Sequence, residues 1–215
     1  MSSPVIEQQI VLARPSYISL ALKRAIDILG AVVGLTLLSP TFLVIALLIK
    51  LQDGGPVIHR RRVAGTKGEF DLFKFRSMCV NADAVLQKDP KLFAEFQKNF
   101  KLVNDPRITP LGRFLRKTSL DELPQLCNVL LGEMSLVGPR SITREELDRY
   151  GSMRDVFLSV RPGLSGHWQT EGRQKVTYQE RVQMELYYVQ NWSLLWDLRI
   201  LLKTPQVVLK GDGAH

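Results

Sequence analysis

The stretch AIDILGAVVGLTLLSPTFLVIALLI, residues 25–49, is the longest apolar run in the sequence and decides the fold. As a straight α-helix rising ~1.5 Å per residue, it is just long enough to cross a hydrocarbon core of ~30 Å. A run of this length and uniformity is atypical of a helix buried in a soluble core. The sequence therefore predicts a membrane segment.

Ser39-Pro40 lies in the middle of this run and argues against a plain crossing. Pro40 has no N–H to donate to the carbonyl of Thr36, and its ring clashes with that carbonyl, so a kink or break is expected there. This residue pair is thus the predicted structural break of the helix.

Both flanks of the apolar run are basic, with Lys23 and Arg24 before it and Lys50 and residues 60–62 after it. Positive charge favours the cytoplasmic side of a membrane. If both flanks obey this rule, the segment enters the membrane, turns at Ser39-Pro40 and returns. We favour this re-entrant form, and a kinked single crossing is the alternative.

The whole chain has 215 residues, 45% of them hydrophobic, and a formal net charge of +8. Its length suits one compact domain with a membrane element. The charge indicates an anionic partner, which could be a nucleic acid, a phosphorylated small molecule or a membrane surface. Two cysteines without a CxxC and three scattered histidines predict neither disulfides nor a zinc site, and favour a reducing compartment.

The predicted fold class is α+β, a mainly helical small domain with a short β-hairpin. Two short strands are expected around a turn at residues 65–68. Helices are expected over 80–103, with an interruption at 89–90, and over 121–131, 142–160 and 177–209. The expected division is a flexible arm (1–22), a re-entrant membrane helix-break-helix (23–52) and a catalytic domain with interfacial helices (53–215).

Several common catalytic motifs are absent from the sequence. It contains no GxxxxGK[ST] phosphate loop, no GxGxxG, no Asp-x-Asp and no GxSxG. If the chain is an enzyme, its reactive groups are therefore expected to be carboxylates.

The best candidate is LRKTSLDELPQLCNVLLGEMSLVGPR, residues 115–140, in which Arg116, Lys117 and Arg140 bracket the adjacent pair Asp121-Glu122. A carboxylate can attack phosphorus, and guanidinium groups neutralise phosphate oxygens with paired hydrogen bonds. Mg2+ is typically held by one or two carboxylates together with substrate phosphates. The segment therefore fits phosphoryl-transfer chemistry.

A purely structural interpretation of the same segment stays open at this point. Ser119-x-x-Glu122 has the pattern of a capping box, and acidic residues are stabilised in the first turn of a helix. The two interpretations are compatible, since a capped helix start can also hold a carboxylate facing a phosphate.

Three further features each have a functional and a plain interpretation. Lys74 and Arg76 alternate along a predicted strand, so they line a phosphate site or form a solvated edge. The loop RPGLSGHWQTEGR, residues 161–173, wraps a nucleotide with Arg173 or is only a turn. Trp192 and Trp196, four residues apart, share a helical face that lies at a membrane interface or packs in the core.

Taken together, these segments resemble a known family, the bacterial sugar transferases that act as monotopic polyprenyl-phosphate phosphoglycosyl transferases. The resemblance runs from about residue 23 to 204. It is carried, in the family's order, by KRAIDI (23–28), Ser39-Pro40, KFRSM (74–78), SLDELPQL with LLGEMSLVGPR (119–140), RPGLSGHWQ (161–169) and WDLRILLKT (196–204). The chain looks most like the exopolysaccharide-initiating galactose or glucose phosphotransferases. One departure is His167-Trp168, where many members have Leu-Trp or Leu-Ala.

The resemblance implies a reaction and its residues. Asp121 is the nucleophile that takes a hexose-1-phosphate from a UDP-sugar and releases UMP, and Glu122, with Asp121, holds Mg2+. Polyprenyl phosphate, such as undecaprenyl phosphate, then attacks the covalent intermediate. Substrate phosphate contacts are implied for Arg116 and Arg140.

The resemblance also implies the surroundings of the site. Arg173 is linked to the nucleotide. Lys23 and Arg24 lie at the headgroup level near the lipid phosphate. The soluble part faces the cytoplasm at the bacterial inner membrane, in contact with phospholipids, and a homodimer is possible.

Two other classes of function remain as alternatives. A membrane-tethered binding or scaffold protein would use Asp121-Glu122 only as a helix cap. A basic nucleic-acid-binding domain is disfavoured, because no nucleic-acid motif is present, and no nucleic-acid partner is expected.

Overall fold

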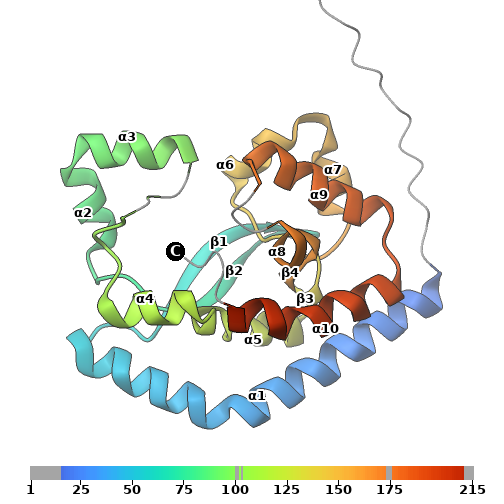
Figure 1. Ribbon diagram of the computed structural model, residues 1–215, viewed down its shortest axis with the longest axis horizontal. Coiled ribbons are helices and arrows are strands. Elements are labelled where there is room, and N and C mark those ends of the chain that lie inside the picture. Colours follow the sequence, from blue (N-terminus) through green and yellow to red (C-terminus); the bar gives the residue numbers. More distant parts are fainter. Residues whose placement is uncertain (1–15, 100–101, 103, 173–175, 211–215) are drawn as a thin grey trace, which may run out of the picture.

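The computed structural model describes residues 16–99, 102, 104–172 and 176–210. A long N-terminal helix, α1 (Tyr17–Asp53), runs beneath a group of short helices and two small sheets (Figure 1). The strands are β1 (Ile58–Gly65), β2 (Gly68–Phe75), β3 (Ser135–Val137) and β4 (Gly163–Ser165). The helices that follow α1 are α2 (Ala82–Lys88), α3 (Pro90–Asn99), α4 (Pro110–Lys117), η1 (Leu120–Glu122), α5 (Gln125–Leu131), α6 (Arg144–Leu147), η2 (Asp148–Met153), α7 (Arg154–Leu158), α8 (His167–Glu171), α9 (Tyr178–Gln190) and α10 (Leu194–Lys210). This mainly helical chain with a short hairpin agrees with the predicted α+β class.

Helix α1 stays continuous through Pro40 and is bent near its middle, so that its two limbs form a wide V around the domain (Figure 1). The Ser39 hydroxyl donates to the Thr36 carbonyl at 2.9 Å. This bond satisfies the acceptor that Pro40 cannot reach. The helix is therefore kinked at Ser39-Pro40, as expected, but it is not broken there into two helices. Residues 17–22, assigned above to the arm, belong to this helix.

The two faces of α1 differ in burial. The inner face buries Ala31, Ile45 and Ile49 against the domain, while large apolar side chains point outward along the whole helix, among them Leu29, Leu37, Leu43, Leu47 and Leu51. Its most apolar 18-residue window has a mean hydropathy of 2.5 and is only 11% buried. By length and composition the helix could cross a membrane, and most of this window is exposed.

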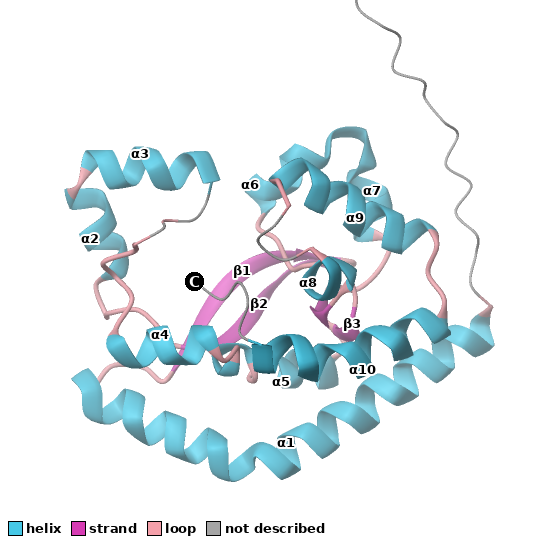
Figure 2. Ribbon diagram, viewed as in Figure 1, coloured by secondary structure: helices cyan, strands magenta, loops and turns pink. Residues whose placement is uncertain are grey.

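The predicted hairpin is present, with β1 and β2 antiparallel from Ile58↔Phe75 to Gly65↔Gly68 (Figure 2). Asn128 from α5 pairs with the outer edge of β2, where it accepts from the Phe73 N–H at 3.0 Å and donates to the Asp71 carbonyl at 2.8 Å. The fully buried side-chain amide of Asn128 thus forms hydrogen bonds with two backbone groups of β2 that would otherwise have no partner at the edge of the sheet.

A second, parallel pair of strands was not anticipated from the sequence. β3 and β4 pair in the register Ser135↔Gly163 and Val137↔Ser165. At Gly138 an added Cβ would lie 2.4 Å from the Arg161 carbonyl oxygen, so this close approach requires glycine. The pairing brings the Gly-Pro-Arg turn against the 161–166 loop.

Two of the expected helical stretches are more fragmented than predicted. The 142–160 segment divides into α6, η2 and α7, with Gly151 at φ 52° between helical turns. The last stretch breaks after Gln190, and Trp192 lies in the connection between α9 and α10. Trp192 and Trp196 therefore do not share a helical face. Both pack against the cluster that contains Tyr188 and Ile200.

Candidate active site

The Asp121-Glu122 pair lies in a single 3-10 turn, η1, between α4 and α5. Ser119 has a left-handed backbone (φ 56°), and its side chain makes no capping hydrogen bond. The predicted capping box is therefore not formed, because the side chain of a left-handed Ser119 cannot occupy the extended N-cap geometry. The other part of the structural interpretation holds, since Asp121 and Glu122 both lie in the first turn of a short helix.

Glu122 pairs with Lys74, the penultimate residue of β2, with Nζ and Oε1 2.5 Å apart. Burial by itself would raise the pKa of Glu122, but the charges of Lys74, Arg140 and Arg116 outweigh it and hold the pKa below its usual value. Glu122 is therefore an anion at neutral pH, surrounded by cations.

Asp121 is in the opposite situation, although it is the adjacent residue. Its side chain is buried, and the residue is 7% exposed. Burial and the neighbouring Glu122 charge raise the pKa of Asp121 to about 6, against the opposing charges of Lys74 and Arg116. Two adjacent carboxyls whose environments drive their pKa values apart are typical of sites that assign them different roles.

Arg116 reaches the site from the last turn of α4. Its Nε donates to the Ser77 hydroxyl at 2.9 Å, and its charge acts on both Asp121 and Glu122. Helix α4 can approach this closely because it begins at Pro110 after an N-cap by Thr109, and because Gly112 packs directly on the Ser77 backbone. Ser77 thus holds the side chain of Arg116 near the dyad, and its contact with a phosphate stays a prediction.

Arg140 approaches from the Gly-Pro-Arg turn that follows β3. Its backbone N–H donates to Glu185 Oε1 at 3.1 Å, and its guanidinium lies 5.3 Å from the centre of the Trp168 ring. The charge of Arg140 lowers the pKa of Glu122. Asp121, Glu122, Lys74, Arg116 and Arg140 therefore form one electrostatic group, which we call the dyad site.

Sequence reasoning missed two residues of this region, Ser77 and His59. His59 is the cross-strand partner of Lys74 in the hairpin, so their side chains share a face. Burial and then the charge of Arg61 lower the pKa of His59, and Lys74 and Arg116 act in the same direction. The signal that could have identified His59 is the hairpin register, since a 65–68 turn places residue 59 opposite residue 74.

Arg76 is not brought to the dyad. Its Nη1 pairs with Asp53 Oδ2 at 2.6 Å, and its Nε donates to the Pro56 carbonyl at 2.7 Å. Because β2 ends at Phe75, the strand alternation that would have aligned Arg76 with Lys74 no longer applies. Arg76 instead fastens the end of α1 to the domain.

Lys23 and Arg24 are also engaged by the domain. Lys23 Nζ lies 2.5 Å from Asp197 Oδ2 and 2.9 Å from the Val137 carbonyl oxygen. Arg24 donates to the carbonyls of Val129 and Leu130 at 2.7 and 2.9 Å, in the last turn of α5. A lipid-phosphate role for these two residues stays a prediction, and Arg173 lies outside the described residues.

The donor set of the dyad site suits a hard divalent cation only in part. Among the described residues, no group of three or more His, Cys, Asp or Glu side chains is placed to hold a metal. Asp121 and Glu122 offer two carboxylates, which matches the number that Mg2+ usually takes when substrate phosphates and water complete its shell. These two carboxylates would fit Mg2+ only if a phosphorylated substrate also bound it, and Mg2+ stays a prediction.

Comparison with known proteins identifies the family of the chain. Residues 18–211 match the family model described as bacterial sugar transferase, and the chain belongs to that family. It is 50% identical over 200 residues to an undecaprenyl-phosphate galactose phosphotransferase of Salmonella typhimurium, and 48% over 198 residues to a UDP-galactose-lipid carrier transferase of Erwinia amylovora. It is 46% identical over 198 residues to the exopolysaccharide production protein ExoY of Sinorhizobium fredii.

These matches each cover 90% of the chain but differ in how much of the relative they cover. The chain spans 42% of the length of the Salmonella and Erwinia proteins and 88% of the ExoY protein. The family match, residues 18–211, includes the dyad site and all of α1 but its first residue.

Proposed function

We propose that this protein transfers a hexose-1-phosphate from a UDP-sugar to undecaprenyl phosphate and releases UMP, as an initiating step of exopolysaccharide synthesis. The observation that carries the proposal is the buried carboxyl of Asp121 beside an ionised Glu122 and three cations. The names of the relatives, which include galactose phosphotransferases and ExoY proteins, support galactose or glucose as the sugar.

In the first step, the Asp121 carboxylate attacks the phosphorus that carries the sugar. The new bond joins a carboxylate oxygen to this phosphorus, and the bond to the bridging oxygen breaks, so that UMP leaves with the bonding electrons. Burial favours the attack, because a desolvated carboxylate with a raised pKa is a stronger nucleophile than a solvated one.

The cations of the dyad site stabilise the charge that builds on the phosphate oxygens. Arg116 and Arg140 present guanidinium groups suited to paired hydrogen bonds with phosphate. Lys74 would supply a third positive charge to the phosphate oxygens when Glu122 binds Mg2+ instead of pairing with the lysine. Glu122 and Asp121 would hold Mg2+, which when bound neutralises non-bridging oxygens of the diphosphate.

In the second step, an oxygen of undecaprenyl phosphate attacks the same phosphorus. The bond to Asp121 breaks, the carboxylate is regenerated, and the product is a polyprenyl diphosphate sugar. This acceptor comes from the bilayer, which accounts for a catalytic domain built directly on an apolar helix.

The way α1 is fastened supports a re-entrant position in the membrane, and the basic flanks of the helix favour the cytoplasmic face. Lys23 binds the domain at one end of α1, and Asp53 binds Arg76 at the other. Between them, Ala31 and Ile49 pack inward. A helix held along its length by one domain cannot cross a bilayer unless that domain lies on both sides. We therefore infer that the bend at Pro40 dips into the membrane and both limbs return.

Asp121→Asn tests the chemistry directly. The variant, in full-chain form in detergent with undecaprenyl phosphate and Mg2+, should lose UMP release from UDP-galactose and UDP-glucose by at least about a thousand-fold, because a neutral amide cannot form the acyl phosphate. Asp155→Asn, on the exposed surface of α7, is the matched control and should keep full turnover. Retained turnover in Asp121→Asn would exclude the covalent route.

The same variant should not unfold. A raised pKa means that ionised Asp121 opposes folding at neutral pH: its contribution is most favourable below the unfolded value near 4 and is lost as pH rises through about 6. Asparagine removes this ionisation cost, so the melting temperature at pH 7.5 should equal or exceed that of the parent. Lost activity with an intact melting transition identifies a chemical defect.

A further inference from the structure

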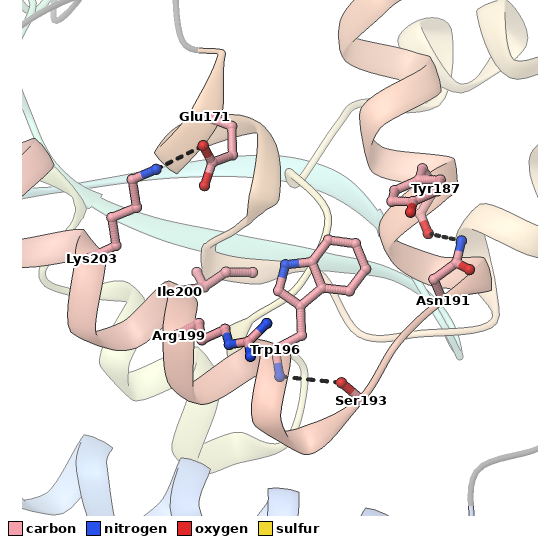
Figure 3. Close-up of a pocket in the computed structure, with 8 residues that line it drawn as sticks. All are labelled: Glu171, Tyr187, Asn191, Ser193, Trp196, Arg199, Ile200 and Lys203. Atoms are coloured by element: carbon pink, nitrogen blue, oxygen red, sulfur yellow. Dashed lines mark hydrogen bonds and ion pairs between the residues drawn. The ribbon is translucent and has the colours of Figure 1, made fainter.

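A cavity of about 450 Å³ lies among α8, α9 and α10, and none of the dyad-site residues line it (Figure 3). Trp196, Arg199 and Lys203 line it from α10, Tyr187 from α9 and Glu171 from the end of α8. The phosphotransfer chemistry described above does not use this cavity.

The charges around the cavity leave one cation without a counter-ion. Lys203 Nζ pairs with Glu171 Oε2 at 2.7 Å, so these two charges compensate each other (Figure 3). Arg199 is exposed, and its guanidinium makes no hydrogen bond or ion pair with any residue that the structure describes. The cavity therefore offers a single unpaired positive charge.

One wall of the cavity is aromatic. The Trp196 ring lies 5.7 Å from that of Tyr187 and 4.9 Å from that of His167, between centres. Burial lowers the pKa of His167, which keeps its ring neutral at pH 7. His167 thus contributes an uncharged ring, and the wall joins Trp and Tyr beside an arginine, the side-chain combination typical of a membrane interface.

The cavity also lies next to an exposed apolar surface. Leu195, Leu198 and Leu202 are exposed on α10, at spacings that place them on one side of the helix. Helix α10 is fastened to α1 by the Lys23–Asp197 pair. In Figure 3, α1 runs below α10, and Trp196 and Lys203 extend from α10 to the other side. The cavity thus stands above the apolar surfaces of α10 and α1.

We propose that this cavity binds the phosphate-bearing headgroup of an anionic phospholipid. Arg199 pairs with the phosphodiester, whose single negative charge matches the one unpaired cation, and Trp196 and Tyr187 contact the glycerol region. The acyl chains lie along Leu198 and Leu202. The proposal rests on the membrane placement of α1 and is independent of the phosphotransfer reaction.

The test compares lipids retained by the full chain. The protein is reconstituted in nanodiscs of phosphatidylcholine with a minority of phosphatidylglycerol, released into mild detergent, and its bound lipids are counted by native mass spectrometry. Phosphatidylglycerol should be enriched over its bulk fraction. Arg199→Gln should reduce this enrichment about five-fold, the usual effect of one basic residue near an anionic surface. Lys203→Gln, which leaves Glu171 uncompensated, should reduce it as well.

Arg113→Gln is the matched control, because Arg113 is an exposed arginine on α4, away from the cavity, and should leave the enrichment unchanged. Equal retention of the two lipids, or an equal loss in Arg113→Gln and Arg199→Gln, would overturn the proposal. Displacement of phosphatidylglycerol by millimolar inorganic phosphate would overturn it too, since it would indicate a site for free anions. UMP release by Arg199→Gln in detergent should stay at the parental level, which separates this test from that of Asp121.

Discussion

At the residue scale, the pKa of Asp121 is set by burial and by the neighbouring charges, of which that of Lys74 on β2 has the largest effect. Lys74 is the largest of the influences that oppose burial and hold the pKa of Asp121 down. It does so while its ammonium is 2.5 Å from Glu122 Oε1. The same side chain therefore keeps Glu122 ionised and limits how far Asp121 departs from a normal carboxyl.

This arrangement predicts a pH dependence. The rate of UMP release should fall on the acid side near pH 6, where Asp121 becomes protonated, and Lys74→Met should move this acid limb to higher pH, because a cation that lowers the Asp121 pKa is lost. The measurement is a pH profile of kcat/KM, normalised to each variant's own maximum. Lys117→Met, at an exposed position of α4, should leave the midpoint in place. A midpoint that moves down or stays fixed in Lys74→Met would contradict the assignment.

The sequence could predict which residues form the dyad site only where they are close together along the chain. Asp121, Glu122 and Arg116 lie within one short segment, so local pattern sufficed to group them. Lys74 and Arg76 are only two residues apart, yet Lys74 reaches Glu122 while Arg76 reaches Asp53. That separation depends on where β2 ends, which strand alternation does not reveal.

At the element scale, the position of α4 decides where Arg116 lies. A Cβ at Gly112 would come within 1.9 Å of the Ser77 carbonyl oxygen, a backbone atom that cannot swing aside. Gly112→Ala should push α4 off the 77–79 segment and break the Arg116–Ser77 bond. We expect UMP release to fall at least about ten-fold with a lowered melting temperature, as for overpacking of a close contact.

The comparison variant for this change is Ser77→Ala, which removes only the hydroxyl that orients Arg116. It should raise KM for the UDP-sugar and leave the melting temperature close to that of the parent. If Gly112→Ala and Ser77→Ala both behave as the parent in steady-state assays, α4 does not position Arg116 for substrate.

Element prediction was good where turn residues marked the ends of an element and poor where the pairing partner was remote in the sequence. The hairpin and the helices around residues 89–90 follow from turn residues and local pattern. The parallel strands β3 and β4 have three residues each, and the paired residues Ser135 and Gly163 are 28 positions apart in the sequence. No local pattern therefore predicts this pairing. Trp192 lies outside a helix, where its indole N–H donates to Asp197 at 3.0 Å, a contact that residue spacing does not reveal.

At the scale of the whole molecule, α1 is both an apolar helix long enough to cross a membrane and a part of the domain core. Ala31 belongs to the same buried cluster as Val63, Leu72 and Val129. Buried Asp27 accepts hydrogen bonds from the Ser135 hydroxyl and the Leu136 N–H, both at 2.9 Å. The helix is thus integrated into the domain along its inner side, which a hydropathy pattern alone could not indicate.

This integration predicts the topology of the chain. Since the domain binds α1 near Lys23 and again at Asp53, both ends should stay on one side of the membrane. Tags joined to the two termini should resist a membrane-impermeant reagent in intact bacterial cells and react with it once the inner membrane is permeabilised. A tag on a secreted reporter, labelled in the same cells, controls for reagent access. Labelling of one terminus but not the other in intact cells would establish a single crossing, and the contacts at one end of α1 would then have to be absent in the membrane.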